Sequence, residues 1–209
     1  MKQIISSILI LLIVYSCTNS LIYRKSENGD LIFVEATKDN LSGAIDRATK
    51  NDSNSLSYDH IGIIEKTNNK TYILHSSPKN GSEKIGLNKF IRKQGRLHKK
   101  LALYRLKDKN CSNKAVTIAN TMLNKPYNFS YIQNDNSYYC SDFVERAFRN
   151  CNVFDLQPMN FKNLKTGEID EYWIDYYKNL KMKVPQGLPG TNPNAMSRNK
   201  KLNVVIIER

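Results

Sequence analysis

The chain has few of the residues that characterise fibrous, disordered or disulfide-built proteins. Its 209 residues include only 9 glycines and 6 prolines, too few for a collagen-like or low-complexity protein. Hydrophobic residues make up 40% of the sequence, which is more than a disordered chain contains. The 4 cysteines are too few for a scaffold held together mainly by disulfides. What remains is a globular protein, and its length favours a single domain.

Acidic residues are also scarce, since 19 Asp and Glu stand against 32 Lys and Arg, for a formal net charge of +13. The basic residues are spread over separate tracts and do not alternate with aromatic residues, and the sequence has no zinc-finger or RNA-binding motif. We therefore expect no nucleic-acid partner. The charge predicts a solvated basic surface that is attracted to anionic lipid or to cell wall.

The sequence also lacks an apolar run of the ~20 residues that a membrane-spanning helix needs. Its N-terminal run, Ile4–Val14, follows a positively charged start and matches the hydrophobic region of a secretory signal. The residues Val14-Tyr15-Ser16-Cys17 resemble the lipobox of bacterial lipoproteins, in which the cysteine is lipidated. An ordinary secretory signal or a short anchor is the alternative.

The expected organisation is a signal peptide at residues 1–16, a polar tether at residues 17–28 that begins with the lipidated Cys17, and one domain at residues 29–209. The resemblance to lipoproteins implies an exported protein that its N-terminal lipid anchors to a bacterial membrane. Its expected place is the periplasm, or the outer membrane and cell surface.

Lipidation of Cys17 leaves Cys111, Cys140 and Cys151. Because three is an odd number, an exported protein keeps at least one of these thiols unpaired or pairs it with another chain. A free thiol in an oxidising compartment is a liability unless it has a chemical role. The cysteine count is therefore a first indication of thiol chemistry.

Apolar patterning predicts a mixed fold. Short apolar runs predict strands at residues 31–34, 60–65, 71–75, 101–106 and 202–207. Helical spacing predicts helices at residues 41–50, 115–123, 140–150 and 172–180, and a Pro/Gly loop follows at residues 184–194. Since strands and helices do not alternate regularly, we expect an α+β fold with one sheet.

Two histidines are predicted to face each other across a β-hairpin. With a four-residue loop at residues 66–69, His60 on the first strand lies directly opposite His75 on the second, on the same face of the sheet. Opposed residues have Cβ atoms about 4.5–5.5 Å apart, which is close enough for two imidazoles to interact.

Cys140 is predicted to open an amphipathic helix that turns its apolar face, with Phe143 and Val144, toward the sheet. The positive end of a helix favours a thiolate, so we expect a lowered pKa for this thiol. Its backbone N–H could also donate to an oxyanion. A histidine on the sheet could deprotonate the thiol while a second polar group orients that histidine, which is the thiol version of the catalytic triad.

Simpler interpretations of these residues stay open. A cysteine before an apolar helix face is often a small buried hydrophobe, and a histidine in a strand is often structural. A zinc site built from Cys140, His60 and His75 has suitable ligand types, but no metal-binding spacing such as Cys-x-x-Cys supports it.

Four segments of the sequence are similar to those of a known family: Gly29–Phe33, Asp59–Ile63, Tyr72–His75 and Tyr138–Val144. In this order they resemble the YiiX/YebB-like branch of the NlpC superfamily, which are circularly permuted papain-like cysteine hydrolases. The histidine precedes the cysteine, as the permutation requires. The resemblance covers most of the chain, from about Gly29 to Ser197, and implies a central antiparallel sheet packed against a helix that starts at the nucleophilic cysteine.

The resemblance implies that Cys140 is the nucleophile and His60 the general base. A third residue after the second strand, often a glutamate in this branch, is His75 here, and we expect it to orient His60. Glu65 is the nearest acid in sequence, but its place at the end of a strand makes it a poor substitute.

The implied reaction is hydrolysis of an amide through an acyl-thioester, in cell-wall or other short peptides, with no cofactor and no metal. Tyr127, Tyr139 and Asp135 are candidates for substrate binding, and the loop at residues 185–194 either covers the site or straps the domain. We expect a monomer.

Two other functions stay open. The same permuted fold hosts acyltransferases and lipases that act on lipid, and a long apolar groove beside Cys140 would favour that function. A non-catalytic lipoprotein that binds surfaces through its basic residues would be favoured if Cys140 were buried out of reach of any histidine.

Overall fold

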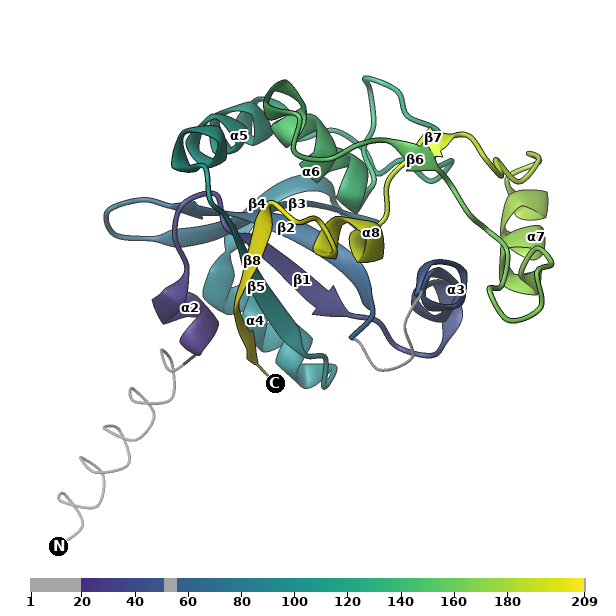
Figure 1. Ribbon diagram of the computed structural model, residues 1–209, viewed down its shortest axis with the longest axis horizontal. Helices are drawn as coiled ribbons and strands as arrows, with labels where there is room; N and C mark the ends of the chain where they lie inside the picture. Colours follow the sequence, from purple (N-terminus) through teal and green to yellow (C-terminus); the bar gives the residue numbers. More distant parts are fainter. Residues whose placement is uncertain (1–19, 51–55, 209) are drawn as a thin grey trace, which may run out of the picture.

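The chain is built around a six-stranded antiparallel sheet (Figure 1), seen in a computed structural model that describes residues 20–50 and 56–208. In spatial order its strands are β4 (Gly81–Gly86), β3 (Thr71–Ser77), β2 (Tyr58–Lys66), β1 (Leu31–Glu35), β5 (Leu101–Leu106) and β8 (Leu202–Glu208). The short strands β6 (Gln157–Pro158) and β7 (Pro189–Gly190) form a separate pair. The predicted signal peptide and Cys17 lie outside the described residues.

Helices cover both faces of this sheet. They are α2 (Leu21–Lys25), α3 (Asn40–Thr49), α4 (Leu87–Arg96), α5 (Lys109–Thr121), α6 (Cys140–Phe148), α7 (Glu171–Asn179) and α8 (Pro193–Ser197), with a 3-10 turn at Arg149–Cys151. This arrangement confirms the predicted α+β fold with a central antiparallel sheet. It also confirms that a helix begins at Cys140. Among the described helices, none is long and apolar enough to cross a membrane.

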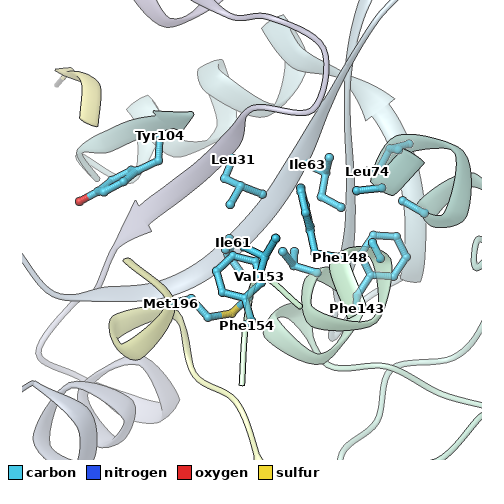
Figure 2. Packing of buried hydrophobic residues seen from close by; sticks show 14 of the residues in the cluster. Leu31, Ile61, Ile63, Leu74, Tyr104, Phe143, Phe148, Val153, Phe154 and Met196 are labelled. Atoms are coloured by element: carbon cyan, nitrogen blue, oxygen red, sulfur yellow. The ribbon is translucent and has the colours of Figure 1, made fainter. Parts of the chain in front are cut away.

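Alternate residues of the central strands pack on opposite faces of the sheet. Ile61 and Ile63 of β2 pack with Phe143 and Phe148 of α6, in the cluster that Figure 2 shows. The intervening Ile64 packs on the other face, in a second cluster that includes residues of α4. Because both faces are covered, the strands appear in the sequence as continuous apolar runs rather than as a strict alternation.

The second half of the predicted tether is folded onto the domain. Ile22 in α2 is completely buried, and it packs with the cluster beneath α4. The carboxylate of Glu208 at the end of β8 accepts hydrogen bonds from the hydroxyl of Ser20 and from the backbone N–H groups of Leu21 and Ile22. These bonds cap the start of the short helix and join the two ends of the domain.

Sequence patterning missed β4 and α4. The six residues of β4, Gly-Ser-Glu-Lys-Ile-Gly, contain a single large apolar side chain, so no apolar run marks the strand. In α4 the buried positions Leu87, Phe90 and Gln94 stand at helical spacing, but basic residues separate them. The missed strand and helix matter because both contribute side chains to the candidate site.

A disulfide joins Cys111 near the start of α5 to Cys151 beyond the end of α6. It ties together the two helices that cover one face of the sheet. Cys140 is left as the free cysteine of the described residues, and it is buried. The odd number of cysteines is therefore resolved by one intrachain pair and one free thiol.

Candidate active site

The hairpin that carries the two histidines has a register two residues away from the predicted one. The ladder between β2 and β3 runs from Ile63 opposite Leu74 to Lys66 opposite Thr71, so the turn is at residues 67–70 rather than 66–69. The predicted direct opposition of His60 and His75 is therefore wrong. Because side chains alternate with a period of two, a shift of two residues keeps both histidines on one face, as diagonal neighbours.

The two imidazoles are hydrogen-bonded to each other. His60 Nε2 lies 2.9 Å from His75 Nδ1, and the two rings stand nearly perpendicular, at 89°. The ring of Phe90 in α4 packs edge-on against His75 at a centroid distance of 5.4 Å. Gly62 makes room for this pair, since a Cβ atom there would lie 3.0 Å from His75 Cβ and 2.6 Å from Ile73 Cδ1.

The start of α6 is inserted where β2 and β3 separate. On the β3 side, Ser76 Oγ donates a 2.6 Å hydrogen bond to the carbonyl of Tyr138. On the β2 side, Cys140 Sγ donates to the carbonyl of Asp59 at 3.9 Å, and the backbone N–H of Ile61 donates to the sulfur. The sulfur therefore contacts the main chain of the residues before and after His60. The side chains of Cys140 and His60 line the same cleft, which holds about 830 Å³.

Burial, rather than the helix end, dominates the ionisation of Cys140. The thiol lies in a residue that is only 6% exposed, and burial together with the charge of Asp59 raises its pKa to about 12. Backbone N–H groups of Ile61, Ser141 and Cys140 itself oppose this rise but do not cancel it. The expectation of a lowered pKa was wrong, because desolvation of the thiolate outweighs the favourable field of the first helical turn.

Both histidines are held neutral as well. Burial lowers the pKa of His60 well below its ordinary value, with smaller contributions from His75, Lys99 and Lys93. Burial also lowers the pKa of His75 to about 4, against the opposing effect of Glu83. At neutral pH the site thus combines an uncharged thiol with two uncharged imidazoles.

Glu83 is a member of the site that sequence analysis missed. It pairs with His75 across β3 and β4, and its Oε1 lies 3.5 Å from His75 Nε2. Its carboxylate also accepts hydrogen bonds from Ser77 Oγ at 3.0 Å and from Asn80 Nδ2 at 2.8 Å. A prediction of a third antiparallel strand at residues 81–86, next to the hairpin, would have placed Glu83 opposite His75. Glu65, the acid considered from the sequence, instead pairs with Lys84.

Two of the three predicted substrate-binding residues lie at the site. Tyr127 and Tyr139 line a second, small cavity of about 60 Å³ that Cys140 also lines. Asp135 does not belong there, because its side chain is 93% exposed and pairs with Arg146. Its position close before the cysteine in the sequence was misleading, since the intervening turn carries it to the surface.

Aromatic side chains and the C-terminal loop form the walls of this small cavity. Its lining includes Tyr127, Tyr131, Tyr139, Phe161, Trp173 and the segment 191–193. The backbone N–H of Thr191 donates to Tyr139 Oη at 3.1 Å, which holds the loop against the start of α6. The predicted Pro/Gly loop is therefore a wall of the site.

No group of three or more His, Cys, Asp or Glu side chains within residues 20–50 and 56–208 is arranged to hold a metal ion. In the described structure Cys140, His60 and His75 lie together, but each nitrogen of the central hydrogen bond is engaged by the other ring. These two ring nitrogens are therefore placed to hydrogen-bond to each other rather than to bind a shared metal ion.

Comparison with known proteins identifies similar sequences and folds. The sequence model of the permuted papain-like amidase enzymes, the YaeF/YiiX or C92 family, matches residues 25–206. The crystal structure of metalloprotein yiiX from Escherichia coli O157:H7 is similar, with 23% sequence identity and a TM-score of 0.68. The similarity covers 88% of this chain and 98% of that one. No curated protein matches. The permuted papain-like fold expected from the sequence is confirmed.

The space that Gly62 leaves for the histidine pair yields a testable prediction. Gly62→Ala should lower the free energy of unfolding by about 1–3 kcal/mol, because the new methyl group collides with Ile73 and with the Cβ of His75. Urea denaturation of the two proteins measures the difference. Gly95→Ala is the matched control, since a Cβ atom there meets nothing within 4 Å and alanine favours the helix. Equal stability of Gly62→Ala and the wild type would contradict the tight fit.

Proposed function

Because the chain belongs to the permuted papain-like amidase family, we propose that it is a cysteine amidase or peptidase that cleaves an amide through an acyl-thioester on Cys140. The observation that carries the proposal is the position of the sulfur. It sits in the opening between β2 and β3, against the main chain on both sides of His60, whose imidazole is bonded to that of His75. This arrangement supports the nucleophile and the base that sequence analysis assigned.

The carboxylate of Glu83 determines which ring nitrogens carry protons. A negative charge beside His75 Nε2 favours a proton on that nitrogen, which leaves Nδ1 as an acceptor. His60 Nε2–H then donates to His75 Nδ1. The remaining nitrogen of His60, Nδ1, carries the lone pair that can accept the thiol proton.

The proposed reaction proceeds by concerted proton transfer and attack. As Cys140 Sγ bonds to the substrate carbonyl carbon, its proton moves to His60, and backbone N–H groups at the start of α6 stabilise the oxyanion. Collapse breaks the carbon–nitrogen bond, and His60 returns the proton to the leaving amine. A water molecule, deprotonated by His60, then attacks the thioester and releases the acid and the free thiol.

The neutral resting state supports a step of this kind. A thiol with a raised pKa holds little thiolate, so it is a weak nucleophile until a base removes its proton. His60, whose pKa is lowered, is free to act as that base across the neutral pH range. Glu83 stabilises the imidazolium that forms, through His75.

A short peptide fits the cavities around Cys140. The aromatic cavity beside Cys140 holds about 60 Å³, which is room for a small side chain. The cleft of about 830 Å³ that Cys140 also lines has room for the rest of a peptide. The match to a family of amidases favours an amide substrate over the alternative of an acyltransferase or lipase. The position of the sulfur against the main chain around His60 argues against a purely structural cysteine.

Covalent labelling tests the roles of Cys140 and His60. A peptide chloromethyl ketone at pH 7 should alkylate Cys140, and His60→Gln should lower the alkylation rate about 100-fold, because no other base takes the proton. Mass spectrometry of the digested protein follows the adduct with time. His98→Gln, which changes an exposed histidine, is the matched control. Equal labelling of His60→Gln and the wild type would exclude His60 as the base.

Replacement of Glu83 tests the relay through His75. Glu83→Gln should lower the maximal alkylation rate on the order of tenfold and leave inhibitor affinity unchanged, because only the charged intermediate loses stabilisation. The carboxylate favours the protonated imidazoles, so its loss should move the acidic limb of the rate profile to lower pH.

The matched control for this experiment is Glu65→Gln, since Glu65 pairs with Lys84 on the same sheet and does not line the cleft. It should leave both the rate and the pH profile unchanged. A merely structural role of Glu83 predicts a lower melting temperature with no movement of the acidic limb, and that result would contradict the relay.

A further inference from the structure

One wall of the catalytic cleft carries a concentration of positive charge. The cleft that contains Cys140 and His60 is also lined by Lys79, Lys89, Arg92, Lys93, Arg96 and Lys99. Four of these lie on α4 at spacings of three and four residues, so they share one face of the helix. We call this face, made of Lys89, Arg92, Lys93 and Arg96, the basic wall.

The acids that the structure describes along the cleft, Asp59 and Glu83, are engaged by side chains outside the basic wall. Asp59 is engaged by Lys99 at 2.5 Å, and Glu83 accepts from Ser77 and Asn80 beside His75. Within the part of the chain that the structure describes, Lys89, Lys93 and Arg96 form no ion pair.

The charge of the basic wall reaches the reacting groups. Lys93 contributes to lowering the pKa of both His60 and His75, which places its ammonium group within electrostatic range of the two rings. The wall is exposed toward the cleft, while the buried Phe90 beneath it keeps the surroundings apolar. The charges of Lys89, Lys93 and Arg96 over this apolar floor focus their field into the cleft and attract anions.

The small aromatic cavity beside Cys140 has a different character. Among the described residues no Lys or Arg lines it, and its walls are mainly apolar and phenolic, with Asp59, which Lys99 pairs, at the edge that it shares with the cleft. A substrate that reacts at Cys140 therefore meets two cavities, an aromatic one without basic side chains and a cleft with several. This asymmetry orients a substrate whose two ends differ in charge.

We propose that the substrate is an acidic peptide, whose carboxylates bind the basic wall of α4 while a small uncharged group beside the scissile amide enters the aromatic cavity. This assignment rests on the proposed function, because it takes the bond cleaved at Cys140 to be an amide. Carboxylates suit the wall since lysine and arginine side chains donate charge-assisted hydrogen bonds to them. The wall thus selects the substrate, and none of its side chains accepts or donates the transferred proton.

Binding to an inactive protein tests this proposal independently of catalysis. The probes are two amidated pentapeptides, Ala-Glu-Ala-Glu-Ala and Ala-Gln-Ala-Gln-Ala, each with the same neutral fluorophore. Fluorescence anisotropy with Cys140→Ala protein should show about tenfold tighter binding of the acidic peptide at low ionic strength. The preference should disappear near 1 M salt, where charges are screened beyond about 3 Å.

Substitution of the wall completes the test. In the Cys140→Ala background, Lys89→Gln, Lys93→Gln and Arg96→Gln together should make the affinities for the two peptides equal. The matched control replaces three exposed lysines, Lys178 in the last turn of α7 and Lys181 and Lys183 just beyond it, with glutamine. It removes the same charge and should keep the tenfold preference.

Three results would overturn the proposal. The first is equal affinity of the Cys140→Ala protein for the two peptides. The second is a preference for the acidic peptide that remains after the three substitutions in the basic wall. The third is the loss of that preference in the control with the three substituted lysines as well. Binding of phosphatidylglycerol vesicles without discrimination between the peptides would assign the wall to a membrane surface instead. Since none of these measurements uses Cys140, they are distinct from a failure of the labelling experiment, which would reject the amidase itself.

Discussion

The insertion of the start of α6 between β2 and β3 is the constraint on which the candidate site depends. Ser76 holds the carbonyl of Tyr138 from one strand, and the main chain around His60 holds the Cys140 sulfur from the other. Because β2 pairs with β3 only from Ile63 onward, the carbonyl of Asp59 and the N–H of Ile61 can hydrogen-bond to the thiol of Cys140. The same separation of strands opens the cleft in which the sulfur, the imidazoles and the basic wall meet.

Burial at this position has a chemical consequence. A thiol and two imidazoles that share a poorly solvated site stay neutral, because each charged form would lose its hydration. In the proposed mechanism, the free cysteine reacts only when a substrate brings a carbonyl carbon to it. In the same mechanism, the nearby Glu83 stabilises, through His75, the positive charge of a protonated His60.

Much of the fold could be predicted from sequence because apolar runs and helical spacing report burial directly. Leu31–Glu35 and the helix at Cys140 are examples. The histidine register was displaced by two residues, since a turn at 66–69 and one at 67–70 fit the sequence equally well. Because side chains in a strand alternate with a period of two, this shift did not change the prediction that both histidines lie on the same face of the sheet. Glu83 and the basic wall were missed since polar strands and strongly basic helices carry little apolar signal. The raised pKa of Cys140 depends on packing that no local pattern contains.

Nitrogen NMR of the two active-site histidines tests the central claim most directly. At pH 7 in the wild type, both rings should be neutral, with a measurable coupling across the hydrogen bond from His60 Nε2 to His75 Nδ1. Replacement of Cys140 by alanine should shift the His60 Nδ1 signal, because the proposed proton transfer brings the thiol to that nitrogen. A charged ring at pH 7, the lack of a coupling, or a His60 signal indifferent to Cys140 would contradict the proposed meeting of the thiol and the imidazole pair.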